Sequence, residues 1–198
     1  MARIRSSKAH AKVVRAALEL FGERGIDATS MDAIAQASGV SKATIYNHWA
    51  DKEALLMEVM LFVNGLDREP EEADSGDVYR DLVTILCRRP PGHLEAARNR
   101  ITPGLIAYSA VHQEFGKAWR HRVMEPPRKN IRSLLRRGVE KGLLREDLDL
   151  EIGVALLLGP LLYSHIFQKD GKAVAPDFGR AVVEAFWRGH ARSKTARD

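Results

Sequence analysis

A group of hydrogen-bond donors lies between residues 42 and 52, and it is the stretch best suited to binding chemistry. The donors that share this stretch are Lys42, Thr44, Tyr46, Asn47, His48 and Lys52. Side chains of these types bind phosphate oxygens and the edges of nucleic-acid bases. The set contains no acidic side chain, which would repel a phosphate backbone. These residues therefore favour recognition of a DNA duplex over bond-breaking chemistry.

Two short helices joined by a tight turn are predicted to position these donors. We expect Thr29 to cap the first helix, with Asp32 three residues later, as in a capping box. Gly39 suits the left-handed backbone that ends a helix. Ser41 is expected to cap the second helix. The pattern predicts a helix-turn-helix within residues 29–52.

The second helix of this motif is predicted to have one buried and one exposed face. Ile45 and Trp49 are four residues apart, so they share a face that can be buried. The donors then lie on the opposite face, as in a helix that enters the major groove. Asp51 is expected to cap a further helix, which places Lys52 at the positive helix end where phosphates bind.

Residues 20–56 read LFGERGIDATSMDAIAQASGVSKATIYNHWADKEALL. This sequence resembles the DNA-binding domain of the TetR family of transcriptional regulators, with cap, turn, tyrosine and lysine in register, and the resemblance covers roughly residues 10–56. It implies a DNA-binding set made up of Thr29, Ser30, Lys42, Ala43, Thr44, Tyr46, Asn47, His48 and Lys52. Ala43 replaces the glycine of many members and Asn47 occupies a variable position, so no operator sequence is implied.

The predicted contacts divide by the part of the duplex that each side chain reaches. Phosphate contacts are expected from Tyr46, His48 and Lys52. Base-edge contacts are expected from Lys42, Thr44 and Asn47.

Composition and charge are those of a globular protein that can bind nucleic acid. The 198 residues are 45% hydrophobic and 29% charged, with a formal net charge of +5. Cys87 is the only cysteine, so no disulfide forms within the chain. The longest nearly uncharged run, residues 152–168, is shorter than the ~20 apolar residues of a membrane helix, and the N-terminus has no apolar signal core. We therefore expect a cytoplasmic protein without a membrane segment.

The periodicity of apolar residues predicts an all-α fold. Helices are expected at residues 7–21, 53–67, 78–86, 93–100, 103–112 and 115–143, after Asp149, and from Pro176 to Arg192. Residues 1–7 are expected to form a loose basic arm, residues 67–77 an acidic surface linker, and Pro126–Pro127 a bend. We predict a three-helix DNA-binding domain over residues 1–52, and a helical ligand-binding and dimerisation domain over residues 53–198.

The last two helices are more apolar than a monomer of this size needs, which suits a two-fold interface. The TetR resemblance implies a homodimer through the same helices, and hence a palindromic operator. The interface residues are expected to be Leu157, Leu161, Phe178, Val182 and Phe186.

Aromatic and small polar residues recur on helices that could enclose a pocket. The candidate ligand-binding residues are Phe62, Tyr79, Tyr108, His112, Trp119 and Tyr163. They favour a small hydrophobic ligand, uncharged or anionic, although each could also simply fill the core.

The predicted function is a sequence-specific transcriptional regulator, a repressor that a small ligand releases from its operator. Two alternatives are a helical enzyme or carrier with a vestigial DNA-binding domain, and an architectural DNA binder without a ligand. The seven histidines show no paired metal-ligand spacing, so we expect no metal, cofactor or catalysis. A basic helix face formed by Arg128, Arg132 and Arg136 could be a second nucleic-acid site, but a solvated face is the favoured interpretation.

Overall fold

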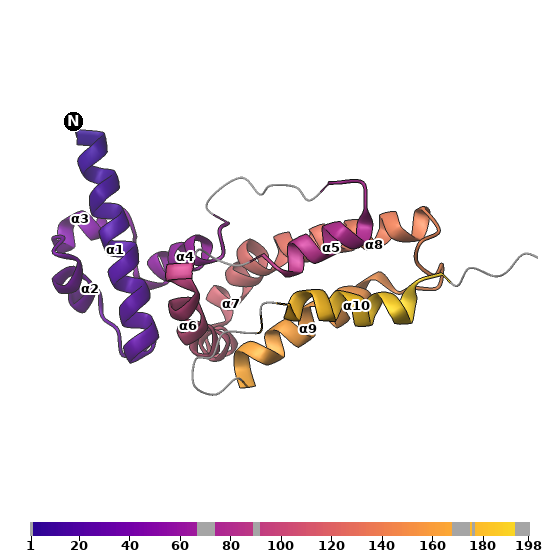
Figure 1. Cartoon of the computed structure of the whole chain (residues 1–198). Helices are drawn as coiled ribbons and strands as arrows, with labels where there is room; N and C mark the ends of the chain where they lie inside the picture. Colours follow the sequence, from indigo (N-terminus) through magenta and orange to yellow (C-terminus); the bar gives the residue numbers. More distant parts are fainter. Residues whose placement is uncertain (1, 67–73, 89–91, 168–174, 176, 193–198) are drawn as a thin grey trace, which may run out of the picture. The chain divides into compact units, whose positions relative to one another are not determined.

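The computed structural model describes residues 2–66, 74–88, 92–167, 175 and 177–192. Within these ranges the chain forms ten α-helices and one π-helix and no strand, which confirms the all-α prediction (Figure 1). None of the described helices is both long enough and apolar enough to cross a membrane. The chain divides into two compact units. Unit 1 comprises residues 1–70 and 89–123, and unit 2 comprises residues 71–88 and 124–198.

The boundary predicted at residue 52 lies inside unit 1. It separates two functions, whereas the two units are separated by compactness, so the predicted boundary stays a prediction. Unit 1 contains α1 (Ala2–Arg24), α2 (Met31–Ser38), α3 (Lys42–Tyr46), α4 (Lys52–Val63), α6 (Gly92–Val111) and α7 (Gln113–Trp119). The π-helix η1 (Arg120–Met124) follows α7 and contains the division between the units.

Helix α1 is the centre of unit 1, since it packs against α2, α4 and α6. It buries Val13, Ala17, Leu18 and Phe21, a stripe at helical spacing. The helix begins at Ala2, so the expectation of a loose arm over residues 1–7 is wrong for the described residues. Gly and Pro are the residues least favourable inside a helix, and residues 2–21 contain neither.

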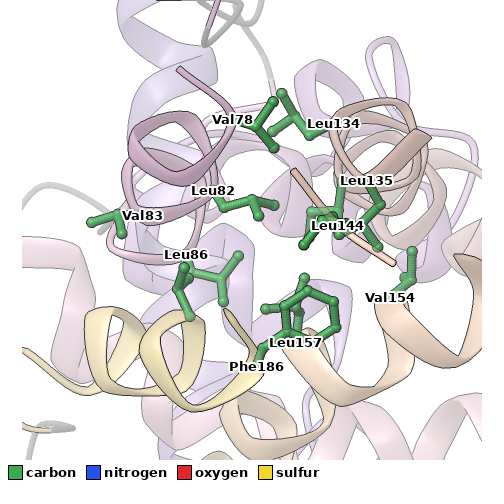
Figure 2. Close-up of a cluster of buried hydrophobic side chains, with 12 residues drawn as sticks. Val78, Leu82, Val83, Leu86, Leu134, Leu135, Leu144, Val154, Leu157 and Phe186 are labelled. Carbon is green, nitrogen blue, oxygen red and sulfur yellow. The ribbon is translucent and has the colours of Figure 1, made fainter. Parts of the chain in front are cut away.

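Unit 2 contains α5 (Val78–Leu86), α8 (Glu125–Glu140), α9 (Leu150–Phe167) and α10 (Phe178–His190). Figure 2 shows its core, in which Leu82 of α5, Leu135 of α8 and Leu157 of α9 point toward one another. Phe186 of α10 closes this cluster. The predicted helix over residues 78–86 and the predicted cap at Asp149, which accepts from the Ile152 N–H at 3.0 Å, are confirmed.

After residue 92, the helix boundaries that were predicted from prolines are wrong. Helix α6 is continuous through Pro103, where two helices were expected. Buried residues continue at helical spacing across that proline, and their packing outweighs the lost backbone hydrogen bond; they are Leu94, Ala97, Ile101, Leu105 and Tyr108. Pro126–Pro127 lies in the first turn of α8, where a missing N–H costs little, and the chain instead departs from α-helix in η1.

Three further expectations fall at the edges of the described residues. The helix predicted over residues 53–67 ends at Val63, and Gly65 then takes a positive φ of 64°. The predicted acidic linker lies mostly in residues 67–73, outside the described ranges. The last helix begins at Phe178.

Gly179 sits where α10 passes the end of α5, and it provides a stability test. A Cβ there would lie 2.6 Å from the carbonyl oxygen of Leu86, so we expect Gly179→Ala to destabilise the protein by roughly 1–3 kcal/mol. Gly189 is the matched control, because a Cβ at that position of α10 meets nothing within 4 Å. Gly189→Ala should instead be neutral or stabilising by up to about 1 kcal/mol. Equal unfolding free energies for both variants in urea titrations would contradict this packing.

Candidate nucleic-acid interface

The first helix of the motif is capped one residue later than predicted. Ser30, not Thr29, caps α2, and its Oγ accepts from the Ala33 N–H at 3.2 Å. Thr29 is only 1% exposed. Its hydroxyl donates to the carbonyl oxygens of Leu20 at 3.2 Å and Gly25 at 2.7 Å. The buried Thr29 therefore bonds to carbonyl groups at the end of α1 and in the following turn, whereas Ser30 is exposed at the start of α2.

The turn and the second cap are confirmed. Gly39 takes the left-handed conformation with φ 65° and ends α2. Ser41 caps α3, accepting from the Thr44 N–H at 3.2 Å, and its Oγ also lies 2.9 Å from the Thr44 hydroxyl. Helix α3 then extends for only five residues.

Helix α3 and the residues that follow it, residues 42–49, are called the α3 segment. Its buried and exposed faces are those predicted. Ile45 and Trp49 are buried. The side chains that the segment exposes belong to Lys42, Ala43, Tyr46, Asn47 and His48, while Thr44 is half-buried. The segment thus presents a continuous polar surface with hydrogen-bonding side chains, anchored from the opposite side by two apolar ones.

Both lysines of the predicted set have partners within the fold. Lys42 forms an ion pair with Asp32 of α2, and this hydrogen bond raises the pKa of the Lys42 ammonium. The Lys52 ammonium donates to the carbonyl oxygens of Ile26 at 2.8 Å and Asp27 at 3.4 Å. Sequence reasoning missed this role because the acceptors lie about 25 residues earlier in the chain. The phosphate contact assigned to Lys52 stays a prediction.

The start of α4 is the other predicted phosphate seat. Asp51 caps this helix as expected, with its carboxylate accepting from the Ala54 N–H at 2.7 Å. Lys52, the first residue of α4, and Glu53, the second, both have partners elsewhere in unit 1.

Two family models match this sequence and together span both units. Residues 13–59 match the model of bacterial regulatory proteins of the tetR family. Residues 72–186, more than half of the chain, match the model of a tetracyclin repressor-like C-terminal domain. The chain belongs to the TetR family of transcriptional regulators.

Individual TetR-type proteins agree with this assignment. The chain is 33% identical over 168 residues to YdeS of Bacillus subtilis, an uncharacterised HTH-type transcriptional regulator, covering 85% of this chain and 83% of YdeS. It is similar to the TetR-family regulator PfmR of Thermus thermophilus, with 27% identity, a TM-score of 0.66, and coverage of 89% and 97%. The fold also matches FadR of Bacillus subtilis, solved with stearoyl-CoA, at 18% identity, a TM-score of 0.69, and coverage of 90% and 98%.

The predicted ligand-binding residues of this TetR-family chain fall in both units. Phe62, Tyr108, His112 and Trp119 belong to unit 1, and Tyr79 and Tyr163 to unit 2. Tyr163 is 64% exposed, with its ring 4.5 Å from that of Phe167. Tyr79 packs edge-on against Trp187.

Within unit 1, Tyr108 and His112 belong to a polar cluster that sequence reasoning missed. The rings of Tyr108 and His112 stack with centroids 3.7 Å apart. The Tyr108 hydroxyl donates to Glu53 Oε1 at 2.9 Å, and His112 Nδ1 lies 3.5 Å from the same oxygen. Burial and the neighbouring Glu53 carboxylate raise the pKa of the Tyr108 hydroxyl. Helix α6 is thereby tied to the first turn of α4.

The predicted dimer residues also divide between two environments. Leu157 and Phe186 belong to the buried core of unit 2, with Leu161 and Val182 packed against it. On their outer side, α9 and α10 line an open apolar groove of about 420 Å³. Its lining residues include Leu156, Pro160, Phe178, Ala181, Val182 and Ala185. Helical periodicity could not separate the inner from the outer apolar residues of these two helices, and the dimer interface itself stays a prediction.

The basic face of α8 is largely neutralised by carboxylates. Arg128 Nη2 lies 3.2 Å from Glu151 Oε2 of α9, and Arg132 pairs with both Glu125 and Glu151. These pairs agree with the solvated-face interpretation for two of the three arginines. Arg136 is exposed.

Asn47 and Tyr46 allow base and phosphate contacts to be tested separately. Asn47→Ala should relax sequence preference at a base, with a loss of roughly 1–3 kcal/mol of discrimination. Tyr46→Phe should weaken binding to all duplexes alike, by about 0.5–1.5 kcal/mol for one hydrogen bond. Fluorescence anisotropy with operator and scrambled duplexes measures both effects. If Asn47→Ala lowered affinity for the two duplexes equally, the base-edge assignment would be wrong.

Proposed function

We propose that this regulator binds a palindromic operator as a homodimer, represses transcription there in the cytoplasm, and leaves the DNA when a small hydrophobic ligand binds. One observation carries the proposal: the exposed face of the α3 segment has polar side chains and no acid, and buried anchors hold it from behind. Such a face suits the major groove.

The DNA contacts are assigned to exposed side chains and to the half-buried Thr44. Asn47 and Thr44 are assigned to base edges, with Lys42 reaching a base after its exposed pair with Asp32 opens. Tyr46 and His48 are assigned to phosphates. Ser30 replaces Thr29 as the contact at the start of α2, because Thr29 is buried.

Dimerisation is supported by an apolar surface on α9 and α10. Along α9, several large apolar side chains are exposed at helical spacing; they are Ile152, Leu156, Tyr163 and Phe167. They lie on the helix that also forms one wall of the apolar groove. Contiguous exposed apolar surface in general marks a protein interface. A second copy of the same helices would bury it with two-fold symmetry.

A ligand site in unit 1 is supported by an unsatisfied donor on Trp119. This side chain is 9% exposed, and its indole N–H has no hydrogen-bond partner among the described residues. Buried donors in proteins almost always have a partner, so a bound acceptor would complete this one. FadR of Bacillus subtilis was solved with stearoyl-CoA. By analogy we propose an apolar ligand that carries a carbonyl or carboxylate oxygen.

The coupling between ligand and DNA is proposed to act through the first turn of α4. Glu53 accepts from Tyr108 of α6, while its neighbour Lys52 holds the carbonyl groups of the α1–α2 loop. A ligand that displaces α6 or α7 would change the Glu53 contact and thereby the support of the helix-turn-helix. By linkage, DNA and ligand must each weaken the binding of the other by the same factor.

The direct experiment is selection of bound sequences from a library of random duplexes. A dimer should enrich a near-palindrome whose half-site centres are separated by roughly 34–36 Å or a multiple of one helical turn. An unenriched library would refute sequence-specific binding. Enrichment of an isolated half-site would refute binding as a dimer.

The dimer interface can be tested with an exposed residue of the groove. Ala185→Glu introduces a charge into the proposed interface, and because Ala185 is exposed the fold should be unaffected. Light scattering at micromolar concentration should then show a monomer in place of a dimer. Arg180→Glu, an exposed residue of α10 outside the groove lining, is the control and should remain dimeric. A monomeric wild type, or a dimeric Ala185→Glu variant, would contradict the interface.

The ligand site can be tested by removing only the Trp119 N–H. Trp119→Phe keeps an aromatic ring but loses the unsatisfied donor, so thermal stabilisation by stearoyl-CoA or another hit from a metabolite screen should weaken. Trp187→Phe in unit 2 is the control, and it should retain the full shift in melting temperature. Equal shifts in the two variants would place the ligand away from Trp119.

A further inference from the structure

The Glu58 carboxylate of α4 joins two other parts of the DNA-binding region. Its Oε2 accepts from the indole N–H of Trp49 at 2.6 Å. Its Oε1 lies 2.5 Å from Nε2 of His10, which belongs to α1. One carboxylate therefore links Trp49, which follows α3, to α4 and α1.

Ring contacts complete this cluster. The imidazole of His10 stacks on the Trp49 ring, with centroids 4.8 Å apart and an interplanar angle of 29°. The ring of His48 lies 5.7 Å from that of His10, edge-on, and 5.5 Å from that of Trp49. His48 is one of the residues assigned to DNA phosphates, so the cluster supports a proposed DNA contact directly.

The α3 segment depends on such support. A helix of five residues forms little more than one turn, and its nucleation is unfavourable without tertiary contacts. Ile45 anchors its middle and Trp49 anchors its end. Rotation of the Trp49 ring would move His48 and the adjacent end of α3 together.

The His10–Glu58 pair is only partly buried. It can therefore orient neighbouring side chains while adding little to the free energy of folding. The side chains of His10 and Glu58 are 36% and 35% exposed. Exposed charged pairs in general add little to folding free energy. Their geometry, in contrast, can fix a neighbouring side chain to within a fraction of an ångström.

We propose that Glu58 and His10 are positioning residues for DNA binding, which act through Trp49 and His48 to hold the α3 segment in its reading orientation. This proposal rests on the proposed DNA-binding function. It predicts that changes at Glu58 alter operator affinity although Glu58 itself is not assigned to any DNA contact.

Two variants of similar size separate the hydrogen bonds from the bulk of the side chain. Glu58→Gln keeps an acceptor for the Trp49 N–H, whereas Glu58→Met keeps the length but removes both oxygens. Operator affinity should fall about tenfold or more in Glu58→Met, as for loss of a hydrogen bond to a charged group, and remain near the wild-type value in Glu58→Gln. The salt dependence of binding should fall in Glu58→Met by no more than the one phosphate contact assigned to His48, and it should be unchanged in Glu58→Gln.

A matched pair at His10 tests the other side of the carboxylate. His10→Phe keeps the stacking on Trp49 but loses the ring nitrogen that faces Glu58, whereas His10→Gln keeps a donor and loses the stack. We expect intermediate losses of affinity in both. Wild-type affinity in both His10 variants would remove His10 from the proposal.

The Trp49 indole N–H resonance in the NMR spectrum supplies a readout that bulk destabilisation would not move. It should shift in Glu58→Met and stay near its place in Glu58→Gln, with Trp49→Phe identifying the signal. All affinities are measured under conditions where denaturation curves show folded protein. A shifted resonance with unchanged affinity, or a loss of affinity matched by unfolding, would overturn the proposal. Absence of operator binding by the wild type would instead refute the proposed function itself.

Discussion

Helix α3, the proposed DNA-reading helix, is too short to be stable by itself, and the rest of unit 1 compensates for this constraint. Helix α3 has five residues, so few of its backbone groups are satisfied within the helix. The cap at Ser41 and the left-handed Gly39 define where it begins. Burial of Ile45 and Trp49 then fixes its orientation. Its polar face stays exposed because every strong anchor lies on the other side.

The first turn of α4 concentrates the links between this segment and its surroundings. Asp51, Lys52 and Glu53 are consecutive, yet each has a different partner: the helix's own N–H, the loop carbonyls of Ile26 and Asp27, and Tyr108 of α6. A small rotation of α4 would therefore disturb the helix-turn-helix and α6 together. This arrangement suits a regulator whose DNA affinity must respond to events in other helices.

Local signals were readable from the sequence, and contacts between distant residues were not. Gly39, Ser41 and Asp51 act through neighbours within a few residues, so their roles were predicted correctly. Thr29 was misassigned as a cap because its acceptors belong to the end of α1 and the following turn, and Ser30 offers an equally good cap.

The other features that could not be predicted from the sequence depend on packing between helices. Pro103 was predicted to end a helix because a proline removes a backbone hydrogen bond, an effect visible in the local sequence. The buried stripe of α6 outweighs that loss, but it depends on packing against α1, which the local sequence does not show. Leu157 and Leu156 are adjacent and chemically identical, yet one is buried in the core and the other is 45% exposed. The Glu58 cluster joins residues from α1, α4 and the end of α3, and no spacing in the sequence indicates it.

The central claim is that DNA lies on the α3 segment and not on the basic face of α8. Hydrogen exchange, measured peptide by peptide with and without an operator duplex, tests this claim most directly. Bound DNA should slow exchange at the start of α2 and across residues 41–52, and leave residues 128–137 unchanged. Slowed exchange across residues 128–137, with residues 41–52 unaffected, would contradict the account.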